Sequence, residues 1–192
     1  IQSSINSFGS IDMAGSTASA NVEGFVYNAM NAVYQTALSF TSQNYGAGKM
    51  NRVTKILLYC LGLVVMVGAV MGGGAVLIGP KLLQIYSSDP EGISYGMMRM
   101  RIINGSYFLC GIMDTMVGGL RGLGYSVVPM LVSLTGACLF RVVWIFSVFA
   151  MHRTLTTLYI SYPVSWIITF TAHIICYIVI RKRIAARRKP RD

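Results

Sequence analysis

Four long apolar stretches constrain this chain more than any other feature of its sequence. They cover residues 53–79, 102–120, 126–150 and 155–180. A helix that crosses a bilayer needs about 20 mostly apolar residues, and each stretch is about that long or longer. A fifth stretch, residues 22–45, is long enough but unusually polar, and residues 1–14 are consistent with part of a sixth. The sequence therefore predicts an all-α, polytopic transmembrane helix bundle with about five full spans and a partial N-terminal one, in a chain that begins inside an element.

The composition and the placement of charge favour a membrane protein over a nucleic-acid-binding one. Only 11% of the 192 residues are charged, whereas a soluble domain carries roughly 25%. Seven of the sixteen basic residues follow the last apolar stretch directly: Arg181, Lys182, Arg183, Arg187, Arg188, Lys189 and Arg191. Such a block is typical of a cytoplasmic tail beside anionic headgroups. We expect a transmembrane region over residues 1–180, a basic tail over residues 181–192, the lipid bilayer as partner and no nucleic acid.

The distribution of the other basic residues predicts the orientation. Lys49, Arg52 and Lys55 lie in the loop after the polar stretch, and Arg121 follows residues 102–120, on the same side as the tail. The opposite connections hold Lys81, Arg99, Arg101 and Arg153, the first three of which we expect at the external interface. The positive-inside rule places the tail and the loop of residues 46–55 in the cytoplasm. We expect a multi-pass protein of the cell membrane, with a bacterial cytoplasmic membrane as the expected location.

Motifs of metal sites and of intramembrane enzymes are missing from the sequence. The four cysteines lie in four different apolar stretches with no CxxC spacing and no neighbouring histidine cluster, which predicts no metal site. HExxH and paired intramembrane aspartates do not occur. The sequence therefore predicts a protein that is not an enzyme and holds no cofactor.

A polar stripe runs along the stretch of residues 22–45. Its members are spaced three or four residues apart, as on one helix face: Asn28, Asn31, Gln35, Ser39 and Ser42. Glu23 precedes them by five residues. Lipid offers these groups no hydrogen bonds, so the stripe faces either partner helices, which it joins, or a water-filled cavity. The number of polar groups on one face favours the cavity.

The stretch of residues 102–120 carries a second stripe and a carboxylate. The stripe holds Asn104, Tyr107, Gly111, Asp114 and Gly118. A carboxylate at membrane depth is a functional hypothesis by default, so Asp114 is a candidate for binding a coupling ion or proton. The alternative is a structural hydrogen-bond acceptor. Arg121 lies seven residues further, roughly 10 Å along the helix axis, which is too far for a direct pair unless its side chain reaches back.

The last apolar stretch offers a third set of polar groups. Tyr162, Ser165, Thr169 and His173 follow one another at helical spacing, and Pro163 is able to kink the helix. A histidine titrates near physiological pH, so His173 and Glu23 join Asp114 as coupling candidates, although packing is the commoner role for a lone histidine. Arg141 lies inside another span, where we expect a carboxylate or carbonyl partner, or a side chain extended towards headgroups.

Three motifs carry a resemblance to a known family. They are SQNYGAGKMNRV after the polar stretch, the SSDPE turn, and GGLRGLGYSVVP followed by an apolar span that holds Arg141 and Trp144. In these motifs the chain resembles the multidrug and toxic compound extrusion (MATE) family of transporters. The resemblance implies half of a two-lobe, twelve-helix transporter, here the C-terminal lobe from within the seventh helix to the twelfth, with the N-terminal lobe missing.

The same resemblance implies an activity and a set of site residues. Members of the family export small cationic, often aromatic compounds in exchange for Na⁺ or H⁺, through a cavity between the lobes. Some members use an aspartate in the tenth helix, where Asp114 falls, although it lies closer to the LRG turn, and Cys110 occupies the expected position. We therefore expect a secondary antiporter that does not transport as an isolated half. A lipid-linked oligosaccharide flippase of the same architecture and a non-transporting structural subunit are the alternatives.

The predicted cavity lining combines the three stripes. It consists of Asn28, Asn31, Gln35, Ser39, Asn104, Tyr107, Tyr162 and Thr169. Tyr27, Tyr34, Tyr107 and Tyr162 offer aromatic faces that suit a cationic substrate.

Overall fold

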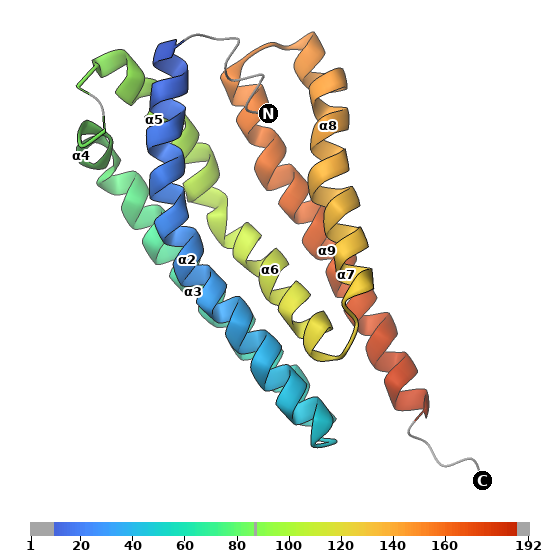
Figure 1. The fold of residues 1–192 in the computed structure, drawn as a ribbon. Helices are drawn as coiled ribbons and strands as arrows, with labels where there is room; N and C mark the ends of the chain where they lie inside the picture. The colour runs from blue at the N-terminus through green and yellow to red at the C-terminus, as the bar shows by residue number, and fades with distance from the viewer. Residues whose placement is uncertain (1–9, 87, 188–192) are drawn as a thin grey trace.

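The computed structural model describes residues 10–86 and 88–187, which form helices and no strand (Figure 1). The elements are α2 (Ser10–Gly46), α3 (Met50–Leu77), α4 (Gly79–Gln84), α5 (Pro90–Ile103), the 3-10 helix η1 (Asn104–Ser106), α6 (Tyr107–Gly122), α7 (Val127–Ser133), the π-helix η2 (Leu134–Leu139), α8 (Phe140–Trp144), the π-helix η3 (Ile145–Phe149) and α9 (Leu155–Arg187). The predicted all-helical bundle is confirmed for this part of the chain.

Several helices are longer than the apolar stretches that predicted them. The polar stretch extends upstream to Ser10 within α2, so residues 10–14 belong to that helix, and residues 1–9 of the predicted partial span lie outside the described residues. Residues 90–122 follow one another through α5, η1 and α6 with no intervening loop. Residues 181–187 of the predicted tail continue α9, and residues 188–192 are not described.

Three helical segments of the described chain are long and apolar enough to cross a membrane. They are Met50–Leu77, Val127–Phe149 and Leu155–Arg187. Many of their exposed side chains are large and apolar, for example Leu58, Val70 and Phe146, as expected where lipid is the solvent. The α2 helix is absent from this set because polar residues interrupt its apolar sequence.

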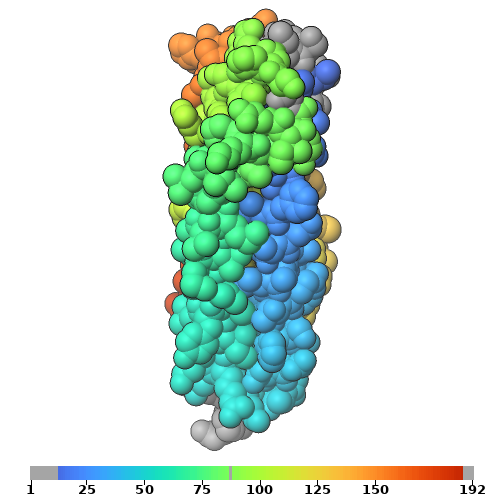
Figure 2. Space-filling model, turned by 90° about the vertical axis from the view of Figure 1, so that its left-hand side faces the viewer, coloured from blue at the N-terminus to red at the C-terminus, as the bar shows by residue number. Residues whose placement is uncertain are grey.

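The α6 helix lies at the centre of the bundle. It packs against α2 and α3 on one side and against α9 on the other, and α9 in turn contacts α7, η2 and α8. Figure 1 shows α6 between the α2–α3 pair and the pair formed by α9 with the α7–α8 segment. Figure 2 shows α2 and α3 side by side over much of the molecule, below the segment that holds α4 and α5.

Small residues allow α6 to approach its neighbours closely. A Cβ atom on Gly118 would lie 2.8 Å from the backbone oxygen of Tyr34 on α2, and one on Gly119 would lie 2.8 Å from the Leu57 side chain on α3. Glycine at these positions removes the clash. The position of Asp114, one helical turn earlier on α6, is thereby fixed between the two sides of the bundle.

Two tight turns lie at the same end of the molecule as the end of α9 (Figure 1). Gly48 joins α2 to α3 with a φ of 76°, and Gly124 joins α6 to α7 with a φ of 87°, a conformation that glycine adopts without steric cost. The exposed side chains of Lys49, Arg52 and Arg121 lie in or beside these turns. The structure therefore gathers at one end the basic segments that the sequence analysis assigned to one side of the membrane.

Candidate functional site

Two adjoining hollows lie between α2, α6 and the C-terminal helices. The first, of about 280 Å³, we name the aromatic hollow because its lining includes Tyr27, Tyr107, Tyr162 and Trp166, together with Glu23, Cys110, Asp114 and Arg141. The second, of about 320 Å³, we name the basic-end hollow; it is lined by Tyr27, Asn31, Tyr34, Asp114, Val117, Arg121 and Ser133. Concave sites with aromatic walls and a few polar groups are typical of small-molecule binding.

Asp114 is common to both hollows. Its side chain is half-buried on α6. Arg121, on the same helix, donates from Nη1 to the hydroxyl of Tyr34 at 2.8 Å. Arg121 does not pair directly with Asp114 in the described part of the chain, as the seven-residue spacing predicted. Within residues 10–86 and 88–187 Asp114 forms no ion pair, so its carboxylate is free to meet a cation from the hollow.

Glu23, in contrast, is already paired. Nε of Arg99 lies 2.8 Å from Oε1 of Glu23, Nη2 lies 2.9 Å from Oε2, and Nη1 donates to the hydroxyl of Ser16 at 2.7 Å. The hydroxyl of Ser19 donates to Glu23 at 3.3 Å, and the Tyr159 ring lies 5.7 Å from the guanidinium carbon. Glu23 is 8% exposed and Arg99 is 7% exposed.

The predicted position of Arg99 at the external interface is therefore wrong. The guanidinium points into the bundle because α2 presents both a carboxylate and a hydroxyl opposite α5. Buried charges persist when they are paired and hydrogen-bonded. Glu23 differs from Asp114 as a coupling candidate, because the charge of Glu23 is balanced by Arg99.

Arg141 lines the aromatic hollow from α8. Its Nε donates to the hydroxyl of Ser165 at 2.9 Å, and its guanidinium carbon lies 4.1 Å from the ring centroid of Tyr162 and 5.8 Å from that of Trp166. The sequence analysis expected a carboxylate or carbonyl partner, or a headgroup. The structure instead gives Arg141 a hydroxyl and aromatic faces, which interact favourably with a guanidinium.

The aromatic walls come from three helices. Tyr107 of α6 lies with its ring centroid 5.5 Å from that of Trp166 on α9, and Tyr162 lies 6.0 Å from Trp166 on the same helix. Tyr27 of α2 lines the hollow as well. The predicted cavity residues Tyr107 and Tyr162 thus meet in one hollow with Asp114.

The polar stripe of α2 divides into two parts. Asn31 lines the basic-end hollow, whereas Asn28, Gln35, Ser39 and Ser42 are exposed. Among the described residues these four make no hydrogen bond to another helix; Ser39 accepts one from Gln43 of its own helix. These four residues therefore line neither hollow and face away from the bundle, whereas Asn31 faces the basic-end hollow.

Three predicted site residues lie between helices and line neither hollow. Asn104 is 1% exposed in η1, and its carboxamide has no hydrogen-bond partner in the described part of the protein. Thr169 donates to the carbonyl oxygen of Ser165 at 2.6 Å. His173 is fully buried, with Nε2 3.3 Å from the carbonyl oxygen of Pro129 and 3.5 Å from the hydroxyl of Ser133. Packing accounts for the position of Thr169 and His173.

Sequence reasoning missed Trp166 and the part played by Arg99 and Arg141. Trp166 follows Tyr162 by four residues, so the helical spacing that selected Tyr162 also identifies its neighbour on the same face. Arg99 lies 76 positions from Glu23, and no local pattern joins residues so far apart.

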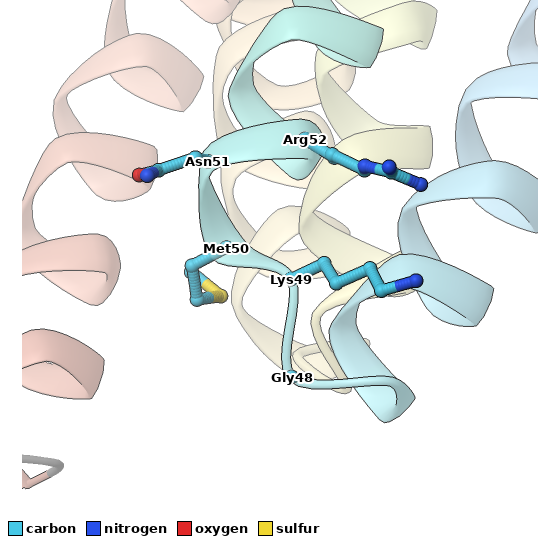
Figure 3. A pocket seen from close by; sticks show the side chains of 5 residues that line it. All are labelled: Gly48, Lys49, Met50, Asn51 and Arg52. Atoms are coloured by element: carbon cyan, nitrogen blue, oxygen red, sulfur yellow. The ribbon is translucent and has the colours of Figure 1, made fainter.

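A third hollow, formed by the turn between α2 and α3, is a different kind of feature. It is lined by five consecutive residues, Gly48 to Arg52. Figure 3 shows the side chains of Lys49 and Arg52 extending to the same side, away from Asn51. A hollow formed by one exposed segment of the chain lacks the converging polar groups of a binding site, so we assign it no function.

Comparison with known proteins assigns this arrangement to a family. The model of the family described as MatE matches residues 1–147, which is most of the chain and includes Asp114, Arg99 and Arg141. The chain belongs to the MatE family. The resemblance found in the three sequence motifs is thereby confirmed. No curated protein matches the chain.

A solved MATE structure shares the fold. The chain is similar to the inward-facing conformation of a multidrug resistance MATE family transporter of the MOP superfamily, with a TM-score of 0.70 and 15% sequence identity. The match covers 95% of this chain and 44% of that chain. The chain therefore spans less than half the length of the transporter that it matches, as expected when one lobe is missing.

Proposed function

We propose that this MatE chain is the C-terminal half of a secondary antiporter that exports small cationic, aromatic compounds in exchange for Na⁺ or H⁺. The observation that carries the proposal is the position of Asp114, a carboxylate that forms no ion pair within the described residues and lines two hollows with aromatic walls. A carboxylate at membrane depth attracts a cation or a proton. Aromatic faces add favourable contacts for an organic cation.

Exchange of the substrate for the coupling ion follows if both bind to the carboxylate of Asp114. Substrate and coupling ion compete for Asp114, so that binding of one promotes release of the other. Alternating access then requires the second lobe, which closes the open side of the hollows and rocks against this one. The exposed polar groups of α2, Asn28, Gln35 and Ser39, are suited to face water or the second lobe rather than lipid.

Orientation and location belong to the same proposal. The end that carries Lys49, Arg52, Arg121 and the basic residues after Ile180 is the cytoplasmic end by the positive-inside rule. We place the protein in the cell membrane, in a bacterial cytoplasmic membrane, with its C-terminus in the cytoplasm. Membership of a transporter family supports transport rather than enzymatic catalysis.

The alternative of a lipid-linked oligosaccharide flippase is less well supported. A pyrophosphate-linked substrate needs several cations around its phosphates. Each hollow is lined by a single arginine, Arg141 in one and Arg121 in the other, and Arg99 is held by Glu23. This charge distribution suits a substrate of low net charge.

The test is transport by the complete protein that contains this chain, reconstituted in proteoliposomes. An imposed Na⁺ or H⁺ gradient should drive counter-movement of an aromatic cation such as ethidium, and addition of ethidium should in turn release the coupling ion. Ethidium movement that neither gradient drives would contradict the proposal. Liposomes that hold only this chain serve as the control and should show no transport.

A further inference from the structure

The α5 helix organises one part of the bundle, which we name the α5 block. The block consists of α4, α5 and the beginnings of α2 and α9, residues 10–23 and 155–162. Arg99 of α5 forms its ion pair with Glu23 of α2, and its guanidinium carbon lies 5.7 Å from the ring centroid of Tyr159 on α9. These contacts hold α5 to the beginnings of both long helices.

The α6 helix organises a second part of the bundle, which we name the α6 block. The block consists of α6 and the later or central parts of three other helices: residues 25–46 of α2, 50–71 of α3 and 164–187 of α9. A Cβ atom on Gly118 would lie 2.8 Å from the backbone oxygen of Tyr34 on α2. Leu120 shares a buried apolar cluster with Leu57 of α3 and Ile180 of α9. The α5 and α6 segments therefore hold different lengths of the same long helices.

The helices that pass from one block to the other are weakened at the boundary. Asn104–Ser106, between α5 and α6, form the 3-10 helix η1, and a mid-helix stretch of this kind often marks a hinge. Pro163 lies inside α9, where proline removes a backbone hydrogen bond. Gly24 of α2 and Gly72–Gly74 of α3 have low helix propensity. Figure 1 shows the dark-blue beginning of α2 upright and the remainder of that helix inclined.

Two observations place these weak points at one level of the bundle. A Cβ atom on Gly72 would clash with the backbone oxygen of Asn104, so the weak points of α3 and of the α5–α6 segment are in contact. The aromatic hollow lies at the same level, because six of its lining residues are within three positions of Gly24, η1 or Pro163. These six are Glu23, Tyr27, Ile103, Tyr107, Tyr162 and Trp166. A change in the angle between the blocks therefore changes the shape of the hollow.

The side chain of Asn104 has an unusual environment for a polar group. It is 1% exposed, and neither Oδ1 nor Nδ2 has a hydrogen-bond partner among the described residues. A buried carboxamide of this kind is destabilising, and such groups are rare in native proteins. The nearby hydroxyl of Ser106, in contrast, donates to the carbonyl oxygen of Ile102 at 2.6 Å, a type of bond that accompanies bending of helices.

We propose that η1, Gly24, Gly72–Gly74 and Pro163 form a hinge within this lobe. The α5 block turns about this hinge against the α6 block and thereby opens and closes the aromatic hollow. The carboxamide of Asn104 forms its hydrogen bonds in the second arrangement, which explains why it is retained at a buried position. The role of this movement in transport rests on the proposed function, whereas the movement itself is measured without transport.

A rigid lobe is the competing explanation. In that case the whole chain rocks as one body against the second lobe, and η1, the glycines and Pro163 serve packing alone. The two explanations differ in the distances within this chain, because only a hinge changes the distance between the two blocks.

Distances between pairs of spin labels, measured by double electron–electron resonance, distinguish the two explanations. The complete transporter, with its native cysteines replaced by alanine, carries labels at the exposed positions of Glu91 in the α5 block and Lys55 in the α6 block. Addition of ethidium should shift this distance by about 2 Å or more, as in hinge movements of domains. Glu91 paired with Lys81, and Lys55 paired with Lys182, are controls inside one block and should not shift.

Two glycines provide a matched pair of stiffening variants. Gly24 lies at the hinge and Gly62 lies inside the α6 block, and a Cβ atom at either position meets no described atom within 4 Å. Alanine favours the helix at both positions, so both variants should raise the melting temperature. Gly24→Ala should also slow ethidium transport by about two- to fivefold, the factor expected from the higher helix propensity of alanine. Gly62→Ala should leave transport unchanged.

Two buried polar residues provide a second matched pair. The hydroxyl of Thr115, in the middle of α6, is fully buried and has no partner in the described part of the chain. Asn104→Leu and Thr115→Val each remove such a group and should raise the melting temperature. Asn104→Leu should slow transport by about tenfold, as expected for loss of hydrogen bonds in one arrangement, and should abolish the ethidium-dependent shift. Thr115→Val should change neither.

The outcomes that overturn the hinge differ from those that overturn the proposed function. An unchanged distance between Glu91 and Lys55 in a protein that exports ethidium would overturn the hinge and leave the proposed function intact. A shifted distance in a protein without gradient-driven transport would support the hinge and overturn the proposed function. Equal slowing of transport by Gly24→Ala and Gly62→Ala would also contradict the hinge. If Asn104→Leu fails to fold, the label pairs and the two glycine variants still decide.

Discussion

Arg99 of α5 and Glu23 of α2 form a two-point ion pair, with Nε 2.8 Å from Oε1 and Nη2 2.9 Å from Oε2. The pair joins α2 to α5 through two residues that lie 76 positions apart in the sequence. Ser16 and Ser19 supply further hydrogen bonds to the two charged groups. The pair thereby fixes the edge of the aromatic hollow and leaves Asp114 as its one carboxylate without an ion pair among the described residues.

Breaking this pair should destabilise the protein strongly. Glu23→Gln leaves Arg99 buried without a counter-charge, and loss of one partner from a buried pair costs about 3–5 kcal/mol. Denaturant or thermal unfolding in detergent measures the effect. The double variant with Glu23→Leu and Arg99→Met removes both charges and should recover much of the stability.

An exposed carboxylate of similar size is the control for this experiment. Glu91 lies in the first turn of α5 and is exposed, so Glu91→Gln should change the free energy of unfolding by about 0.5 kcal/mol or less. If Glu23→Gln were as mild as Glu91→Gln, the buried ion pair would not hold α2 to α5.

Two neighbouring glycines of α3 should respond in opposite directions to the same substitution. A Cβ atom on Gly72 would clash with the backbone oxygen of Asn104, whereas one on Gly73 meets nothing within 4 Å. Overpacking costs about 1–3 kcal/mol, so Gly72→Ala should lower stability. Gly73→Ala should raise it by about 0.5–1 kcal/mol, because alanine favours the helix. Unfolding midpoints in detergent measure both, and equal effects would contradict the close contact of α3 with η1.

His173 should be dispensable for ion coupling. It is fully buried, lines neither hollow, and has its Nε2 beside the carbonyl oxygen of Pro129. Glutamine is similar in size and keeps a donor for that carbonyl, so His173→Gln should leave gradient-driven transport within about twofold of wild type, since such a substitution removes no group that faces the substrate. A folded variant that has lost coupling would return His173 to the mechanism.

The sequence predicted most of the fold because hydropathy and turn residues act locally. The apolar stretches predicted the helices, and the three motifs predicted the family. Helix ends were less predictable. The α2 helix extends to Ser10 because a helix whose other face packs on neighbouring helices tolerates small polar residues. Hydropathy alone does not predict that such residues belong to the helix.

The candidate site was only partly predictable for a geometric reason. Helical spacing showed that Asn28 and Gln35 share a face, but it does not say whether that face meets this bundle or lies outside it. Hydropathy predicted an interfacial position for Arg99 because the analysis of a local stretch detects a charge near a turn. It does not detect the carboxylate of Glu23, which lies on another helix. The structure places Asp114 on α6, at the centre of the bundle, where it lines both hollows; its location in the membrane and its function stay predictions.

The most direct test of the central proposal is coupled transport by the Asp114→Asn variant of the complete transporter. Asparagine preserves the size of the side chain and removes the charge that binds the cation, so gradient-driven efflux of ethidium should be lost while expression and unfolding midpoint stay unchanged. Asp89→Asn is the matched control, because Asp89 caps α5 outside the hollows and asparagine caps equally well; its efflux should equal that of wild type. Unchanged coupled efflux by Asp114→Asn would contradict the account.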